Sequence, residues 1–203
     1  MSFRQQVNRT EMIADPRVRR TRLLLQQALE RLLAAKDFNR ISVQDVAEAA
    51  EVNRATFYDH YPDKFALLEC LVATQFNALL AARGVNFDST CSSALRGIVL
   101  GVCDFLVGAP GIGCSAERRV EEPHLESAII AVVRRMFLEG LHAHPPAGDL
   151  SPEMVASAAS WAIYGAAKEW LKTPGRSSSE EAAKAVLALV SPMLHSVFSA
   201  EST

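Results

Sequence analysis

The side chains best suited to making specific hydrogen bonds gather in one short segment of the chain. Residues 42–64 read S-V-Q-D-V-A-E-A-A-E-V-N-R-A-T-F-Y-D-H-Y-P-D-K, which places arginine, threonine, tyrosine, histidine and lysine side chains between Arg54 and Lys64. Guanidinium, hydroxyl and ammonium groups donate hydrogen bonds to base edges and to phosphate oxygens. No nucleophile in the sequence is paired with a candidate general base, which argues against an enzyme. The segment therefore predicts binding rather than catalysis.

Other chemistries lack the residues that they need. His124, His142 and His144 have no convincing carboxylate or cysteine partner, so no metal is expected. The glycine-rich stretch at residues 108–113 lacks a preceding strand and the GxGxxG spacing, which argues against a nucleotide site. No cofactor is expected. The cysteines are far apart and predict buried, reduced thiols; they are Cys70, Cys91, Cys103 and Cys114.

Two short helices are predicted to position the hydrogen-bonding segment. Ser42 and Asp45 have the spacing of a capping box, which predicts that a helix begins there. After an interruption at residues 51–53, Asn53 can cap a second short helix that ends near His60. A helix from Pro16 to about residue 36 precedes this pair, and another follows it over about residues 63–82. The pair is typical of a helix-turn-helix, whose second helix can enter a major groove about 12 Å wide.

The same segment strongly resembles the DNA-binding motif of the TetR family of bacterial one-component transcriptional regulators. In that family a Ser or Thr opens the second helix, two alanines pack it, and an aromatic block and a Lys follow the recognition residues. The matching positions here are Ser42, Ala47, Ala50, Val52, Arg54, Ala55, Thr56, Phe57, Tyr58, Asp59, His60, Tyr61 and Lys64. The resemblance is sharp over residues 17–70 and only architectural beyond them. Glu51 departs from the family, which often has Gly there because the turn can require a positive φ.

The resemblance implies a role for each matching polar residue. The residues implied to contact phosphates are Ser42, Tyr58 and Lys64. The residues implied to face the major groove are Arg54, Ala55, Thr56 and His60. An arginine can read guanine through two hydrogen bonds, and Ala or Thr can touch a thymine methyl group. Phe57 and Tyr61 are expected in the core, and packing against a neighbouring helix is the alternative role for His60.

The rest of the chain predicts helices throughout. No stretch sustains the alternation of apolar and polar residues that marks a strand, and apolar residues recur at helical spacing. We therefore expect an all-α protein. Residues 1–66 are predicted to form a three-helix DNA-binding domain with the helix-turn-helix at 42–61. Residues 67–203 are predicted to form a helical domain for effector binding and dimerisation.

The C-terminal helices are expected to form a homodimer, because a monomer with one short recognition helix binds DNA too weakly to be specific. The helix over residues 153–172 and the last helix each carry a stripe of small and apolar residues. Two such helices from each subunit would make a four-helix bundle, the dimer arrangement of the family. The residues predicted at this interface are Val155, Ala159, Ala162, Ile163, Ala166, Trp170, Val186, Leu189 and Met193. The alternative is that both stripes pack within one subunit.

The opposite face of the helix over residues 153–172 predicts a ligand pocket. Pockets for small molecules are mostly apolar and have a few polar anchors. The residues predicted to line this pocket are Phe76, Val102, Phe105, Met136, Trp161, Tyr164 and Lys168. The expected effector is hydrophobic or aromatic, with at most one anionic or acceptor group for Lys168 or the Tyr164 hydroxyl. The alternative is an ordinary packed core.

Composition is that of a folded globular protein. The chain has 203 residues, of which 49% are hydrophobic and 22% charged, and a net charge of −2. Residues 1–64 hold 11 basic and 9 acidic side chains, and residues 65–203 hold 10 and 14. The N-terminus lacks the apolar region of a signal peptide, and the longest uncharged stretch of apolar or small residues, Met154 to Ala167, is shorter than the roughly 17 residues of a membrane span. We expect a cytoplasmic protein without a membrane partner.

Together these features predict a homodimeric transcriptional regulator. Its expected partners are a near-palindromic DNA operator, a second copy of the chain and a small hydrophobic or aromatic effector. As a ligand-released repressor, it would leave DNA when its recognition helices no longer match half-sites about 34–36 Å apart. Two alternatives stay open: a small-molecule sensor whose helix-turn-helix contacts another protein, and a small helical enzyme with a polar catalytic cluster.

Overall fold

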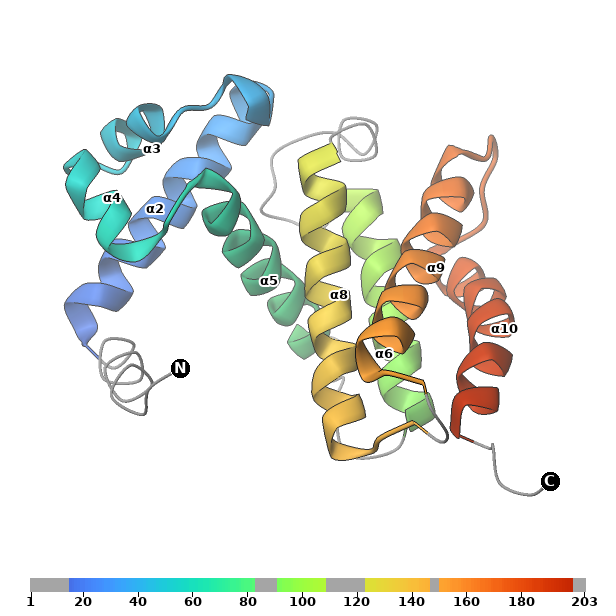
Figure 1. Cartoon of the computed structure of the whole chain (residues 1–203). Coiled ribbons are helices and arrows are strands. Elements are labelled where there is room, and N and C mark those ends of the chain that lie inside the picture. Colours follow the sequence, from blue (N-terminus) through green and yellow to red (C-terminus); the bar gives the residue numbers. More distant parts are fainter. Residues whose placement is uncertain (1–14, 83–90, 109–122, 147–149, 199–203) are drawn as a thin grey trace. The chain divides into compact units, whose positions relative to one another are not determined.

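The computed structural model describes residues 15–82, 91–108, 123–146 and 150–198 (Figure 1). Every regular element in these ranges is a helix, which confirms the all-α fold class. The elements are α2 (Pro16–Ala35), η1 (Phe38–Arg40), α3 (Val43–Ala49), α4 (Arg54–His60), α5 (Lys64–Ala82), α6 (Cys91–Gly108), α8 (Pro123–Ala143), α9 (Pro152–Lys172) and α10 (Ser179–Phe198). Cys114 and most of the glycine-rich stretch at 108–113 lie outside the described residues.

The chain divides into two compact units between Leu71 and Val72. This division falls inside α5, so one continuous helix contributes its first turns to the first unit and its later turns to the second. By length and composition alone, α5 is also the one described helix that could cross a membrane. That is weak evidence for a membrane span, because the core helix of a globular domain passes the same test.

In the first unit, α2 packs against α3 and α4 (Figure 1). α2 begins where the sequence predicts: the Asp15 carboxylate accepts a hydrogen bond from the Arg17 N–H at 2.8 Å, and Pro16 occupies the first helical position. The buried side of α2 forms a common core with apolar residues of η1, α3 and α4 and with Ile41. The resulting core contains Leu25, Ala28, Leu29, Leu33, Phe38, Ile41, Val46 and Phe57.

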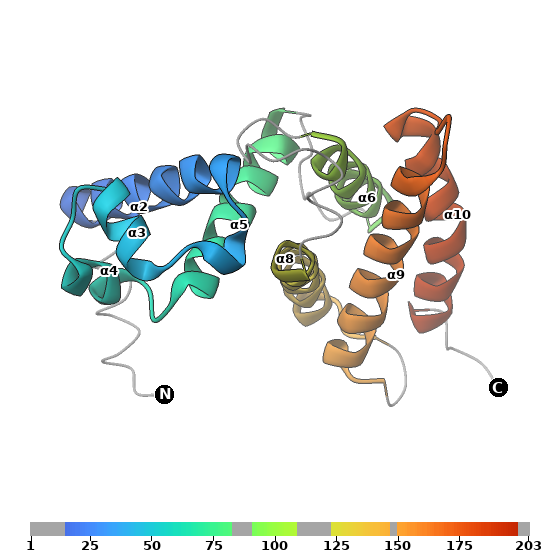
Figure 2. The ribbon, with the colours of Figure 1, turned by 90° about the horizontal axis from the view of Figure 1, so that it is seen from above.

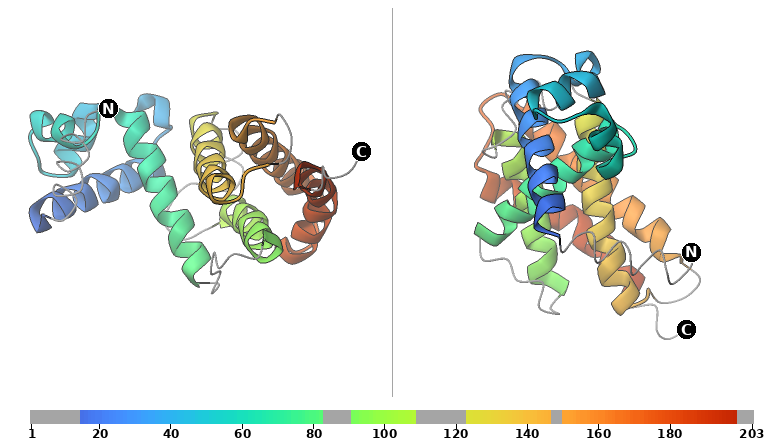
Figure 3. Two further views of the ribbon diagram at one scale, coloured as in Figure 1. Left: turned by 60° about the horizontal axis from the view of Figure 1, so that its bottom comes forward. Right: turned by 90° about the vertical axis from the view of Figure 1, so that its left-hand side faces the viewer.

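In the second unit, α6, α8, α9 and α10 form a helical bundle (Figures 1 and 2). α8 packs against α9, and α10 packs against both α9 and α6. Figure 3 shows these four helices close to end-on. Gly101 allows α5 to approach α6 closely, since a Cβ at this position would lie 2.9 Å from Leu80 and 3.1 Å from Phe76. The bundle therefore has an apolar interior to which α5 adds its second half.

Candidate nucleic-acid interface

A tight turn joins α3 to α4 and sets the spacing of the helix-turn-helix. The Val52 N–H donates to the Ala47 carbonyl at 3.0 Å, and the Glu51 N–H donates to the Glu48 carbonyl at 3.0 Å. These two bonds make a Schellman motif, which requires a left-handed residue just after the helix. Glu51 supplies that residue with a φ of 56°. The turn therefore forms although Glu51 stands where the family often has glycine, and the cost is backbone strain at Glu51.

The N-terminus of α3 carries the predicted capping box. The Ser42 hydroxyl accepts from the Asp45 N–H at 3.1 Å and donates to the Asp45 carboxylate at 2.6 Å, which also accepts from the Ser42 N–H at 2.6 Å. The two hydrogen bonds from Ser42, reinforced by Lys36 with its Nζ 3.1 Å from the carboxylate, lower the pKa of Asp45 to about 2. Ser42 thus acts as a helix cap in this structure, and its contact with a phosphate stays a prediction.

α4 presents a short polar face to solvent. Its N-cap, Asn53, accepts from the Ala55 N–H at 2.9 Å. Phe57 is fully buried, as predicted, and this turns Arg54, Ala55 and Tyr58 outward. The Arg54 guanidinium donates to the Tyr58 hydroxyl at 3.3 Å and lies 5.7 Å from the centroid of the Tyr58 ring. The structure therefore brings two of the predicted DNA contacts together on one exposed side of α4.

Thr56 and His60 are less accessible, because both are half-buried. Nδ1 of His60 is buried and has no hydrogen-bond partner within the described ranges. Burial, followed by the nearby Arg22 guanidinium, lowers the pKa of His60, while Asp59 opposes the shift. This shift favours the neutral imidazole. This environment favours the packing role for His60, and its groove contact stays a prediction.

Tyr61 anchors the end of α4 against the neighbouring helices. Its side chain is buried, as predicted. The Gln26 amide donates to the Tyr61 hydroxyl at 3.4 Å and to the Cys70 sulfur at 3.3 Å, and the hydroxyl donates to the same sulfur at 3.5 Å. Burial is the main cause that raises the pKa of Tyr61 to about 12. These contacts join α2, the end of α4 and α5.

Lys64 is turned towards the protein rather than towards solvent. Its Nζ donates to the backbone carbonyls of Ile41 at 2.8 Å, Phe38 at 3.0 Å and Asn39 at 3.5 Å. The same Nζ lies 4.6 Å from the centroid of the Phe38 ring and 5.6 Å from that of Phe65. The phosphate contact implied for Lys64 is therefore not prepared in this structure.

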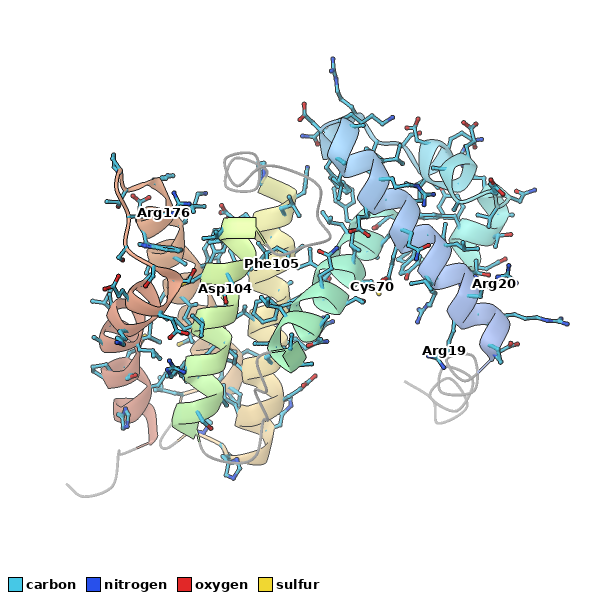
Figure 4. All side chains as sticks on the ribbon, turned by 180° about the vertical axis from the view of Figure 1, so that it is seen from behind. Arg19, Arg20, Cys70, Asp104, Phe105 and Arg176 are labelled. Atoms are coloured by element: carbon cyan, nitrogen blue, oxygen red, sulfur yellow. The ribbon has the colours of Figure 1, made fainter. Side chains whose placement is uncertain are left out.

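The four arginines in the first two turns of α2 divide into two groups by their exposure to solvent. Arg17, Arg19 and Arg20 are exposed, and Figure 4 shows the last two on the first turns of the helix. Arg22 is half-buried, with its guanidinium carbon 5.4 Å from the centroid of the Tyr61 ring. The exposed arginines add positive charge to the unit that carries the helix-turn-helix, which favours attraction to a phosphate backbone.

The predicted dimer interface needs correction. Val155, Ala159 and Ile163 of α9 and Val186 of α10 are already buried within one chain, because these sides of the helices pack into the bundle. The opposite sides carry the exposed apolar surface. The most exposed large apolar residues there are Leu189 at 70%, Met154 at 62% and Trp161 at 57%. Ala162 is exposed as well. Ala166 and Met193 are half-buried.

Neither tryptophan has the surroundings that the sequence predicted for it. Trp161 does not line the interior of the bundle, because its side of α9 faces solvent. Trp170 is half-buried at the connection between α9 and α10, where its Nε1–H donates to the Ser177 carbonyl at 3.2 Å. The Arg176 guanidinium carbon lies 5.9 Å from the centroid of the Trp170 ring (Figure 4). The prediction of Trp161 as a pocket residue is therefore corrected.

The other predicted pocket residues lie in or beside the apolar interior of the second unit. Phe76, Val102, Phe105 and Tyr164 are buried, and Met136 is half-buried. The Phe76 and Phe105 rings are in contact, with centroids 6.2 Å apart; Figure 4 shows Phe105 on α6. The rings fill this part of the bundle, which is the arrangement expected of a packed core as well as of a pocket wall.

One polar group stands out in this interior. The Tyr164 hydroxyl is buried and lies close to the Glu126 carboxylate. Burial, with the carboxylate of Glu126 nearby, raises the pKa of Tyr164. Lys168 forms an ion pair with Glu126 and lies 5.7 Å from the centroid of the Tyr164 ring. Sequence reasoning missed Glu126, whose only signal was an acidic residue in the first turn of a helix.

Comparison with known proteins finds a family match within the first unit. Residues 25–71 match the sequence model for bacterial regulatory proteins of the tetR family. An uncharacterized HTH-type transcriptional regulator of Bacillus subtilis, YxbF, is 44% identical over 59 residues, or 29% of this chain and 16% of YxbF. The HTH-type transcriptional regulator EthR of Mycolicibacterium smegmatis is 38% identical over 64 residues, or 32% of this chain and 28% of EthR. The matches thus span less than a third of each relative.

Solved structures share the fold over most of the chain. Lin0861 from Listeria innocua superposes with a TM-score of 0.65 at 18% identity, covering 88% of this chain and 93% of its own. A TetR transcriptional regulator from Streptococcus agalactiae gives 0.52 at 21% identity, covering 89% and 98%. One from Rhodococcus sp. RHA1 gives 0.54 at 16% identity, covering 87% and 98%. At these identities the likeness is one of fold.

Proposed function

Since residues 25–71 match the sequence model for bacterial regulatory proteins of the tetR family, we propose that this protein is a transcriptional regulator of that family that binds duplex DNA. The observation that carries the proposal is the geometry of α3, the Schellman turn and α4. The turn holds the two short helices at a fixed angle, and the burial of Phe57 turns Arg54 and Tyr58 outward together. Such a helix can enter the major groove and offer its donors to bases.

Arg54 is the best candidate to read a base. Its guanidinium carries the planar pair of donors that guanine accepts at O6 and N7, a contact worth about 1–3 kcal/mol of discrimination. Tyr58 supports this role from one turn further along α4, because its hydroxyl and ring hold the guanidinium. The exposed arginines of α2 supply charge for the phosphate backbone, which governs affinity rather than sequence preference.

We propose further that the protein acts as a homodimer. The exposed sides of α9 and α10 support this, because large apolar residues at such exposure are typical of an interface. Trp161 and Met154 of α9 and Leu189 of α10 are each more than half exposed in the single chain. Ala162, beside Trp161, leaves room for close approach of a second helix. A second copy of this surface is the partner that a two-fold DNA site requires.

The repressor mechanism completes the proposal: a small molecule releases the DNA by binding in the second unit. The buried hydroxyl of Tyr164 among apolar side chains supports a site there, because pockets for small molecules combine an apolar lining with a few polar groups. Lys168 already has Glu126 as its counter-ion, so the effector would be apolar and neutral. It would stabilise the state that does not fit DNA.

Salt-dependent DNA binding tests the proposal. The wild-type chain selects duplexes from a random pool, and the selected duplex and a scrambled one are then titrated at several salt concentrations. We expect tight binding to the selected duplex and a steep fall in affinity with salt for both. A chain that enriches no duplex and shows no salt-dependent DNA binding would overturn the proposal. The alternative, a helix-turn-helix that contacts another protein, would then be favoured.

A further inference from the structure

Lys64 has the surroundings of a residue that holds the protein together. An ammonium group offers three N–H bonds, and three backbone carbonyls lie within hydrogen-bonding distance of the Lys64 Nζ. The bonds to Ile41 and Phe38 are short and the one to Asn39 is long. Because the charge is on the donor, such bonds are stronger than those between neutral groups.

Aromatic rings also hold the ammonium in place. The rings of Phe38 and Phe65 lie close to Nζ and meet each other edge to face, with centroids 5.5 Å apart. Phe38 is fully buried, so the ammonium is partly shielded from water on that side. Attraction between a cation and an aromatic ring grows as water is excluded. Moving this ammonium to a DNA phosphate would break all of these contacts at once.

The three carbonyls belong to η1 and to Ile41, the residue just before the N-cap of α3. Lys64 is the first residue of α5. We propose that Lys64 is a positioning residue that fixes the turn at residues 38–41, and with it the start of α3, to the first turn of α5. In this role it contacts no DNA phosphate. The inference rests on the proposed DNA-binding function and changes the part that the lysine has in it.

The fastening has a consequence for regulation. α5 continues past Leu71 into the unit proposed to bind the effector. Lys64 ties the start of this helix to α3, and the contacts of Cys70 with Tyr61 and Gln26 tie it to the end of α4 and to α2. If the proposed effector displaces α5, these contacts would favour movement of α3 and α4 together with its first turns.

The first test compares the wild type with Lys64→Met, which keeps an unbranched apolar stem and removes the ammonium. Amide hydrogen exchange is measured on the full-length protein without DNA. We expect exchange about tenfold faster in peptides covering residues 38–46, where the held carbonyls and the α3 cap lie. Exchange in α9 is expected to be unchanged. Lys172→Met, which removes an exposed lysine from the second unit, is the control and is expected to leave residues 38–46 as in the wild type.

The second test measures DNA affinity on the selected duplex at several salt concentrations, well below the melting temperature of each variant. We expect Lys64→Met to bind about tenfold more weakly with the same dependence of log affinity on log salt. A lysine that contacts a phosphate gives a different result, because its loss lowers this salt slope by about one. A variant that was merely less stable would bind as the wild type does at this temperature.

Three outcomes would overturn the inference: unchanged exchange at residues 38–46, a salt slope lower by about one, or faster exchange with unchanged DNA affinity. If the wild type binds no DNA, the proposed function fails, and the exchange result alone decides whether Lys64 holds the turn. Should Lys64→Met not fold, Lys64→Gln is compared in the same way, since its neutral amide can replace only part of the hydrogen bonding.

Discussion

Glu51 adopts a backbone conformation that glycine accepts without strain. A left-handed conformation costs a residue with a Cβ about 1–2 kcal/mol. Substitution by glycine would relieve this strain, but part of the gain is lost because glycine gives the unfolded chain more conformational freedom. With φ at 56°, Glu51→Gly is expected to raise the free energy of unfolding by about 0.5–1 kcal/mol. Urea denaturation followed by circular dichroism measures this difference.

The matched control for that substitution is Glu48→Gly. Glu48 is exposed in the helical part of α3, where glycine costs roughly 1 kcal/mol relative to a good helix former. The two substitutions are therefore expected to have opposite signs three residues apart. Equal destabilisation by both would show that the left-handed turn at Glu51 carries no strain.

Asp45 gives the start of α3 a pH dependence. Its pKa is lowered from 3.8 to about 2 in the folded chain, so the charged carboxylate binds its partners only in the native state. The stabilisation is fully present above about pH 4 and is lost as the pH falls towards 2. Asp45→Asn is expected to remove this part of the acid dependence, which thermal unfolding between pH 5 and pH 2 would detect. An unchanged acid profile in the variant would refute the assignment.

At single positions, the sequence predicted structure within a few residues better than it predicted contacts between residues far apart in the chain. The capping box of Ser42 and the inward side of Phe57 follow from spacing and polarity within a few residues, and both are confirmed. The surroundings of Lys64 could not be predicted in this way. Its partners are backbone carbonyls more than twenty residues away, and a carbonyl leaves no mark in the amino-acid sequence.

At the level of elements, helix ends were predictable, but the inward face of α9 was not. α2 and α3 begin at the predicted caps because a cap is a contact between residues two or three apart. α9 has small and apolar residues around most of its circumference. Its periodicity therefore allows more than one inward face, and only packing against α6, α8 and α10 selects Ile163 and Tyr164 over Trp161.

The exposed face of α9 makes a direct prediction about assembly. Ala162→Glu is expected to dissociate the proposed homodimer while leaving the chain helical, since an unpaired carboxylate buried between two copies costs several kcal/mol. Light scattering gives the mass, and circular dichroism gives the helix content. Ala81→Glu, a similar change on the exposed end of α5, is the control and should remain dimeric. A dimeric Ala162→Glu variant would place the interface on another face.

For the whole molecule, the two tryptophans offer separate reporters. Trp161 is 57% exposed in the single chain and would be covered in the proposed dimer, whereas Trp170 is held at the connection by Ser177. Dilution that dissociates the dimer is therefore expected to shift the indole emission to longer wavelength. Trp161→Phe should abolish the shift and Trp170→Phe should retain it, as read from fluorescence spectra over a concentration series. A shift that survives Trp161→Phe would contradict the proposed surface.

The continuity of α5 across the two units also constrains how such chains can be recombined. Lys64 meets the carbonyl of Ile41 in one unit, and Phe76 meets Phe105 in the other. One residue inserted between them would rotate Phe76 by about 100° around the helix axis relative to Lys64, whereas seven would return it to within about 20°. A chimaera that joins this helix-turn-helix unit to a different second unit must therefore be spliced in helical phase, so residues added to or removed from α5 should correspond to nearly whole numbers of helical turns.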